Sequence, residues 1–120
     1  MRRERGSAAE RFGRRAELLC RLALWLKGYR LVAVRARTPL GEIDIVARRG
    51  PVLALVEVKA RPDAGAAAAA LRPRQQARLV RAANALIAGR PDLAALSVRF
   101  DLMLVTPWRW PRHLPDAWRP

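Results

Sequence analysis

Hydrophobic and polar positions along the chain follow two periods, one typical of helices and one typical of strands. From Ser7 or Ala8 to Lys27, apolar residues recur at helical spacing, and Gly28 supplies the stop. The apolar stripe expected to face the core contains Phe12, Ala16, Leu19, Ala23 and Leu26, widened by Leu18, Leu22 and Trp25. Residues 1–7 are charged and include a glycine, so we expect them to be frayed.

Four further runs have the composition and alternation of strands, at residues 29–37, 42–47, 52–59 and 97–105. Residues 38–41 form a turn after the first run, and Gly50-Pro51 lies between the second and third, which predicts a hairpin. A hairpin loop of two or four residues would place Asp44 opposite Glu57, whereas a loop of three residues would not.

Pro73 suits the first turn of a second helix, which we expect to run to about Ala88 and to end before Gly89 and Pro91. Its expected core stripe contains Ala77, Val80, Ala83, Leu86 and Ile87. The alanine- and glycine-rich residues 62–71 predict either a loop or the start of a helix.

The tryptophan- and proline-rich residues 106–120 predict either an irregular tail or a final strand. Tryptophans interleaved with arginines suit base stacking, although such residues more commonly pack over an open edge of a core. No internal repeat and no linker divides the chain, so its 120 residues are expected to form a single domain.

A net charge of +14 changes this picture from an ordinary globular domain to one with a polyanionic partner. Nucleic acid is favoured over an anionic membrane surface, and an arginine-biased, solvated surface is the remaining alternative. Arg74, Arg78 and Arg81 recur at helical spacing and would form one basic face of the second helix. Such a row is usually solvated; the alternative is that it follows a phosphate backbone, together with Arg61.

The single cysteine, Cys20, excludes an internal disulfide and fits a reducing compartment, where we expect it to be a small core residue. No apolar run reaches the roughly 18 residues of a membrane-spanning helix. Arg21 interrupts the apolar run at 18–26, which makes a poor signal peptide. We therefore expect a cytoplasmic protein that does not act in a membrane.

Charged residues within two predicted strands are the candidate chemistry of the chain. Glu57 and Lys59 are two residues apart, so both project from one face of an otherwise apolar strand. Together with Asp44 they supply the parts that hydrolysis of a phosphodiester needs, namely carboxylates for Mg²⁺ or Mn²⁺ and a lysine for water or phosphate. The alternative is a cross-strand ion pair of Asp44 or Glu57 with Lys59 or Arg61 that serves structure alone.

Two motifs, residues 41–47 (GEIDIVA) and 56–61 (VEVKAR), resemble the signature of the YraN family of small bacterial proteins. That family resembles the Holliday-junction-resolvase branch of the PD-(D/E)xK nucleases. The similarity extends from about residue 13 to residue 105. Further positions that match the family are Glu17, Leu24–Tyr29, Arg74-Gln75 and Arg99-Phe100-Asp101.

The resemblance implies an α/β fold with a restriction-endonuclease or resolvase-like core, in which helices flank a mixed sheet of four or five strands. It implies Asp44 and Glu57 as metal ligands and Lys59 as the group that contacts water or phosphate. Glu17 would complete the acidic pocket, and Gln75 would assist. Glu42 is expected either to line the pocket or to form a structural bond, and Asp101 to fix Arg99 or a turn rather than to bind metal.

Two functions follow from these expectations. The first is a metal-dependent endonuclease that acts on DNA, branched or damaged, in repair or recombination. The alternative is a non-catalytic nucleic-acid-binding protein on a nuclease-like scaffold. Resolvase-like enzymes often act as dimers on two-fold junctions, so a homodimer is compatible with the resemblance, although no residue marks a dimer face.

Overall fold

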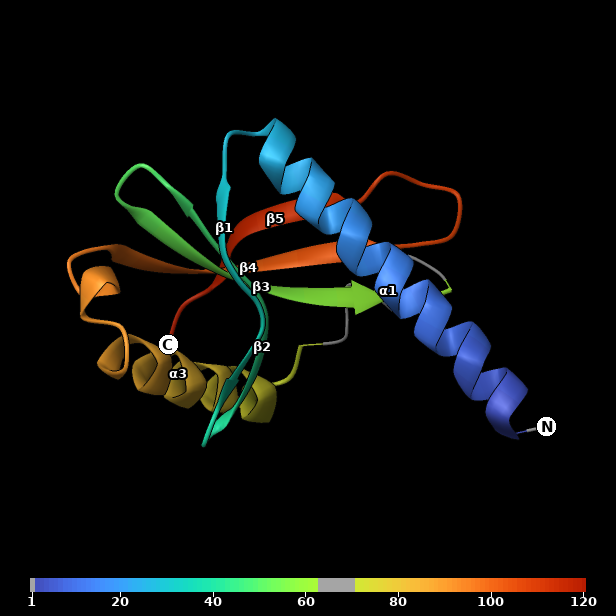
Figure 1. Ribbon diagram of the computed structural model, residues 1–120, viewed down its shortest axis with the longest axis horizontal. Helices are drawn as coiled ribbons and strands as arrows, with labels where there is room; N and C mark the ends of the chain where they lie inside the picture. Colours follow the sequence, from blue (N-terminus) through green and yellow to red (C-terminus); the bar gives the residue numbers. More distant parts are fainter. Residues whose placement is uncertain (1, 63–70) are drawn as a thin grey trace.

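The computed structural model describes residues 2–62 and 71–120, with side chains described from Arg11 onward. Figure 1 shows a twisted sheet with helices packed against it. The elements, in chain order, are α1 (Arg2–Leu26), β1 (Arg30–Thr38), β2 (Gly41–Arg49), β3 (Val52–Ala60), α3 (Pro73–Ala88), the short 3-10 helix η1 (Pro91–Leu93), β4 (Ser97–Val105) and β5 (Arg112–Trp118). The predicted α/β fold, with a mixed sheet and flanking helices, is confirmed.

The sheet has five strands in the order β1-β2-β3-β4-β5. Strands β3 and β4 are parallel, whereas the other neighbouring pairs are antiparallel. Since parallel neighbours need a crossover connection, α3 lies between β3 and β4 in the chain. The C-terminal residues were expected to form either an irregular tail or a final strand. They include β5, which forms an edge of the sheet.

The hairpin between β2 and β3 has the short loop that favoured a pairing of Asp44 with Glu57. Arg49 pairs with Val52, and the ladder continues in this register to Ile45 and Val56. The paired residues of the two strands end there, one position before Asp44 and Glu57. The two strands therefore separate at the candidate site.

The two helices cover opposite faces of the sheet. On one face, side chains of α1 pack on Ile45, Ala47, Ala54 and Val56. On the other face, Leu79, Ala82 and Ala83 of α3 pack on Val46, Leu53 and Leu55. This arrangement follows from the alternation of side chains along β2 and β3, whose apolar residues leave no polar face.

The core stripe predicted for α1 is confirmed in part: Ala16 and Ala23 are buried, and Phe12 packs against the same cluster, but Leu26 and the three residues expected to widen the stripe are exposed. The fully buried residues are Ala16, Cys20, Ala23 and Leu24. The four bulky residues 18, 22, 25 and 26 face solvent, with exposed fractions of 56%, 44%, 68% and 63%. Within residues 16–26 only Glu17 and Arg21 are charged, so apolar side chains lie on several sides of this part of the helix, and its small residues allow the closest approach to the sheet.

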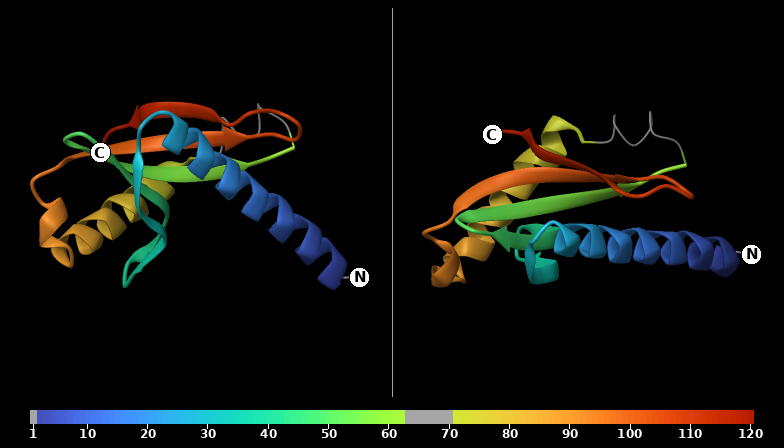
Figure 2. Two further views of the ribbon diagram at one scale, coloured as in Figure 1. Left: turned by 45° about the horizontal axis from the view of Figure 1, so that its top comes forward. Right: turned by 90° about the horizontal axis from the view of Figure 1, so that it is seen from above.

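The ends of α1 also differ from the prediction. It begins at Arg2 rather than at Ser7 or Ala8, so the residues expected to be frayed are helical from Arg2 onward. Arginine, glutamate and alanine dominate this segment and all favour helix. Its N-terminal part projects beyond the sheet (Figure 2). Among the described residues, none of the helices is long and apolar enough to cross a membrane.

The remaining predictions for the second half of the chain have mixed outcomes. The bounds of α3 and β4 are those predicted, and Leu86, Ile87 and Val80 are partly buried, but Ala77 is exposed. The buried side of α3 is centred on Leu79 and Ala82 because that side faces the sheet. The choice between loop and helix at 62–71 lies mostly outside the described residues, since the structure describes only its ends.

Candidate active site

Asp44 lies at the point where β2 and β3 separate. Its Oδ2 accepts a hydrogen bond of 2.8 Å from the backbone N–H of Val58. A side-chain carboxylate thus binds a strand N–H that the ladder between these strands does not reach. This bond fixes the carboxylate beside β3, within reach of the charges that β3 carries.

Glu57 and Lys59 project from one face of β3, as their spacing predicts. The Nζ of Lys59 lies 3.6 Å from Oε1 of Glu57, and their side chains are only 11% and 14% exposed. The second oxygen of Glu57, Oε2, is buried and has no hydrogen-bond partner among the described residues. A buried carboxylate oxygen without a partner is costly and rare in a folded protein.

The three groups influence one another electrostatically. Burial raises the pKa of Glu57 from 4.5 to about 7, and the charge of Asp44 adds to this against the attraction of Lys59. Burial also raises the pKa of Asp44, opposed by the N–H of Val58 and the charge of Lys59. Two such carboxylates resist ionising together unless a cation joins them.

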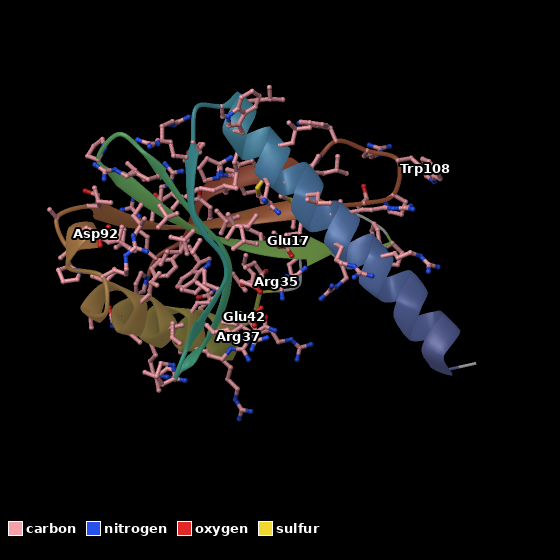
Figure 3. The ribbon with its side chains drawn as sticks, viewed as in Figure 1. Glu17, Arg35, Arg37, Glu42, Asp92 and Trp108 are labelled. Atoms are coloured by element: carbon pink, nitrogen blue, oxygen red, sulfur yellow. The ribbon has the colours of Figure 1, made fainter. Side chains whose placement is uncertain are left out.

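Asp44 also lines an open pocket of about 690 Å³ on the α1 side of the sheet. Glu17 of α1 lines the same pocket, as the family resemblance implies, and accepts a 3.0 Å bond from Nε of Arg35. Figure 3 shows the labelled Glu17 and Arg35 next to each other beside α1. The pocket is lined by Phe12, Gly13, Arg14, Glu17, Arg35, Asp44, Val58, Ala60 and Arg61.

Glu57 and Lys59 are not among the residues that line this pocket. By alternation along β3 they share the face of Leu55, which packs on the α3 side, whereas Val58 and Ala60 face α1. Asp44 therefore links the two sides of the sheet at the position where the strands separate. The site is built around this opening rather than within one pocket.

The structure places the other predicted residues farther from this centre. The Oε1 of Gln75 accepts a 3.4 Å bond from the backbone N–H of Arg72, so Gln75 caps α3 and does not line the pocket. Its assisting role stays a prediction. Glu42 is exposed, and its Oε2 lies 3.8 Å from Nε of Arg37 in a surface ion pair. Of the two roles expected for Glu42, lining the pocket or forming a structural bond, the structure shows the second.

The predicted phosphate contacts fall into two groups. Arg61 lines the pocket and donates a 2.8 Å bond from Nη1 to the carbonyl of Ala60. Arg74, Arg78 and Arg81 are exposed on α3, across the sheet from α1. They form the expected solvent-facing row, separate from the pocket of Asp44.

Two pocket arginines, Arg14 and Arg35, were not identified from the sequence. Arg14 lies three residues before Glu17 on α1, a spacing that places both on one side of a helix and so contained a usable signal. Arg35 has a backbone φ of 50° within β1, in the left-handed region that is costly for arginine. No sequence pattern predicts such a conformation.

Sequence reasoning also missed most of a second cluster, centred on Asp101. Arg99 donates bonds of 2.8 and 2.7 Å to the two oxygens of Asp101, which confirms the expected pairing. His113 lies 2.8 Å from Oδ2, and the N–H of Asp116 donates to Oδ1 at 3.0 Å. Burial alone would raise the pKa of Asp101, but these bonds outweigh it and hold the pKa below its usual value.

Cys20 lies in the core behind the site. It is fully buried in the cluster under α1, as predicted. Burial, and then the charges of Asp44 and Glu17, raise the pKa of its thiol to about 12. The thiol therefore stays protonated and contributes no nucleophile.

The donor set of the site limits which ion it suits. Within residues 2–62 and 71–120, no three or more His, Cys, Asp and Glu side chains are clustered as a complete metal site. Asp44 and Glu57 offer two carboxylates, and Oε2 of Glu57 has no partner within residues 11–62 and 71–120. Mg²⁺ is commonly held by one or two carboxylates and completes its shell with waters and phosphate oxygens, so these residues fit it.

Comparison with known proteins gives consistent matches. The model of uncharacterised protein family UPF0102 matches residues 16–105. A UPF0102 protein of Parvibaculum lavamentivorans is 62% identical over 115 residues, which cover 96% of this chain and 86% of the relative. A UPF0102 protein of Caulobacter vibrioides is 53% identical over 118 residues, covering 98% and 94%. The YraN resemblance is confirmed, because UPF0102 is that family.

Proposed function

We propose that this chain, which belongs to the UPF0102 family, is a metal-dependent nuclease that hydrolyses phosphodiester bonds in DNA. The observation that carries the proposal is the half-buried pair of Asp44 and Glu57, in which the buried Oε2 of Glu57 has no partner among the described residues. A divalent cation would satisfy that oxygen and offset the burial and the repulsion from Asp44 that together raise the pKa of Glu57.

In this proposal Asp44 and Glu57 hold Mg²⁺ or Mn²⁺. Such an ion, when bound, supplies positive charge at the phosphate and lowers the pKa of a water. The hydrogen bond from Val58 orients Asp44, and Glu57 orients the ammonium group of Lys59 at 3.6 Å. Lys59 contacts the attacking water or a phosphate oxygen, a task that a compact ammonium performs better than a planar guanidinium.

The basic surface supports a nucleic-acid substrate. Arg14, Arg35 and Arg61 line the pocket that Asp44 borders, and the whole chain carries +14. Arginine binds phosphate through several N–H groups at once. Glu17 holds Arg35 in place, and the exposed arginines of α3 would follow the backbone farther from the cut. The proposed substrate is branched or damaged DNA. The proposed location of the protein is the cytoplasm.

A cleavage assay tests the proposal. The purified protein is incubated with single-stranded, duplex, forked and four-way-junction DNA in Mg²⁺, in Mn²⁺ and in EDTA. We expect cutting that needs the metal and is lost in Asp44→Asn, which keeps the shape and the bond from Val58 but removes the charge. Cutting that persists in Asp44→Asn would come from a contaminant and would refute the proposal.

A second candidate is a nucleic-acid-binding protein without catalysis. The observation in its favour is that each acid of the site already has a protein partner, namely Val58 for Asp44, Lys59 for Glu57 and Arg35 for Glu17. Binding should then weaken steeply with salt, because phosphate contacts release counterions. Salt-dependent binding that is unchanged in Asp44→Asn, with no cleavage of any substrate, would favour this candidate.

A further inference from the structure

A second cleft lies on the other side of α1 from the pocket of Asp44. It has a volume of about 400 Å³ and lies between α1 and the loop that connects β4 to β5. In Figure 3 the labelled Trp108 lies on this loop, across α1 from the labelled Glu17 and Arg35. The aromatic, basic and apolar side chains that line the cleft include Phe12, Arg15, Leu19, Trp108, Arg109 and Trp110.

Two tryptophans of this cleft do not pack in the core. Trp108 is 102% exposed and Trp110 is 55% exposed, although indole is among the costliest groups to leave in water. Trp118, from the same part of the chain, instead stacks on Phe100 with ring centroids 4.2 Å apart. The expectation that these tryptophans cover an open core edge is thus correct only for Trp118.

The backbone at Trp108 is unusual as well. Its φ is 63°, in the left-handed region that a bulky side chain rarely adopts. A non-glycine residue in that region persists only where the surrounding structure imposes it, and such residues concentrate at functional sites. Here the strained residue is also the most exposed tryptophan of the chain, at the mouth of an apolar cleft.

The chemistry of the cleft selects one kind of occupant. Indole rings stack with every base, and flanking arginines hold the phosphates between them. Arg15 and Arg109 provide those arginines, and none of the described residues that line the cleft is acidic. Within a duplex the bases are stacked on one another, so only unpaired bases can reach the indoles.

The cleft is connected to the proposed active site. Phe12 lines both cavities, while the neighbouring residues Arg14 and Arg15 line one each. On the sheet side, Arg61 lines the pocket of Asp44 and Val105 lines the second cleft. The backbone N–H of Arg61 donates a 3.0 Å hydrogen bond to the carbonyl of Val105, so the walls of the two cavities are directly bonded. The two are thus about one helix width apart, roughly 10 Å, which corresponds to about three stacked nucleotides.

We infer that Trp108 and Trp110 form a binding site for unpaired bases of a DNA strand whose backbone continues to Asp44. The inference rests on the proposed nuclease function and makes its substrate more specific. The substrate is a strand with unpaired nucleotides about three positions from the cleaved bond, as at a fork, a flap or a single-stranded gap. Continuous duplex would use the phosphate contacts alone.

Binding measured in EDTA tests the site without cleavage. The probes are a fluorescein-labelled 12-nucleotide thymidine strand and a duplex of equal length, titrated with wild type and with the double variant Trp108→Ala/Trp110→Ala. We expect the double variant to lose about tenfold or more in affinity for the single strand and little for the duplex. Trp108→Phe/Trp110→Phe should keep most of the affinity, because phenylalanine also stacks.

Trp25→Ala is the matched control, because it removes an indole that is 68% exposed on α1 and does not line the cleft. We expect it to bind both probes as wild type does. A double variant that binds the single strand as wild type does would overturn the inference and leave the cleft to a protein partner. An equal loss on single strand and duplex would overturn it too.

The same variants separate this inference from the nuclease proposal. If wild type cuts no substrate but the selective loss is seen in EDTA, the nuclease proposal fails and the base-binding site stands. If wild type cuts forked and duplex DNA with a preference that the double variant retains, the nuclease proposal stands and the inference fails.

Discussion

Two buried acidic centres lie on neighbouring strands of the sheet and differ in almost every other respect. Glu57 is on β3 and Asp101 on β4, and Asp101 pairs across the ladder with Val56, the residue before Glu57. Both are inside the fold, with side chains 14% and 0% exposed. Burial alone therefore does not distinguish them.

Their hydrogen bonds do. Both oxygens of Asp101 have partners in Arg99, His113 and the N–H of Asp116. Glu57 has Lys59 at 3.6 Å for one oxygen and no partner among the described residues for the other. As a result the pKa of Asp101 is lowered, whereas the pKa of Glu57 is raised to about 7.

The difference teaches how to separate structural from functional acids in this fold. Where a buried carboxylate stabilises the protein, its oxygens are bonded and its charge is balanced within the chain. Where an oxygen has no partner among the described residues and the pKa is raised, as at Glu57, the proposed function assigns a bound cation as the partner. Exchanging acids for amides at each centre should therefore have opposite consequences.

The largest expected effect is on cleavage. Asp44→Asn or Glu57→Gln should lower the cleavage rate by a factor of about a thousand, the size of effect that follows loss of a key electrostatic contact in a transition state. Stability should stay the same or rise, because repulsion between the acids is removed. Initial rates on forked DNA and urea unfolding measure the two.

The matched change at the other centre is Asp101→Asn. Rates per folded molecule should be close to wild type. A thousandfold loss of cleavage in this variant at full folding would mean that the second centre takes part in catalysis, and the comparison would break down.

The next largest effect is the stability of Asp101→Asn. Removing this charge leaves Arg99 and His113 without their buried acceptor, so the free energy of unfolding should fall by about 3 kcal/mol. Urea unfolding followed by circular dichroism measures it, with Asp92→Asn as the control. Asp92 pairs with Arg90 at 2.9 Å on the surface, where such pairs contribute little. A loss below about 1 kcal/mol at Asp101 would contradict the structural role.

The pH dependence of stability should have opposite signs at the two centres. Glu57 has a folded-state pKa of about 7, above its usual 4.5, so between these values the folded protein holds a proton that the unfolded chain releases. The free energy of unfolding of the metal-free protein should therefore fall as pH rises through this window, by roughly 3 kcal/mol. The pKa of Asp101 is lowered from 3.8 in the folded protein. Its charge therefore stabilises the fold above pH 3.8, and this stabilisation is lost as the pH falls below 3.8.

Differences between wild type and variant isolate these contributions from the other acids. The stability of wild type minus that of Glu57→Gln, measured from pH 4 to pH 8 in EDTA, should decline with pH. A difference that is flat or rises with pH would show that Glu57 ionises normally in the fold. The corresponding difference for Asp101→Asn should decline only on acidification below about pH 4.

The features of the fold and site that depend on local sequence signals could be predicted from the sequence. The bounds of α3 and β4 follow from alternation and from the glycine and proline residues at their ends. Gly50 and Pro51 predicted the hairpin but left its register open between two loop lengths, whereas the spacing of Glu57 and Lys59 predicted their common face. Each of these depends on a few consecutive residues.

What could not be predicted depends on contacts between distant segments. The predicted stripe of α1 was too wide because apolar residues lie on several sides of its C-terminal half, and only the sheet decides that Ala16, Ala23 and Leu24 are covered while Leu26 is not. His113 joins Asp101 because β5 pairs with β4, which required knowing that the tryptophan-rich residues form a strand. The opening at Asp44 arises where a ladder ends, and no residue type signals that.

The smallest effect is the response of each centre to Mg²⁺. If the open oxygen of Glu57 is a ligand position, Mg²⁺ at ten times its dissociation constant should raise the free energy of unfolding at pH 7.5 by about 1.4 kcal/mol, seen as a higher melting temperature. Glu57→Gln should abolish this shift. Glu42→Gln is the control, since it removes an exposed acid paired with Arg37 and should keep the shift. An equal shift in Glu57→Gln and wild type would place the ion elsewhere on the chain. The unpartnered oxygen would then have no functional meaning, and the two acidic centres would differ only in how completely each is bonded.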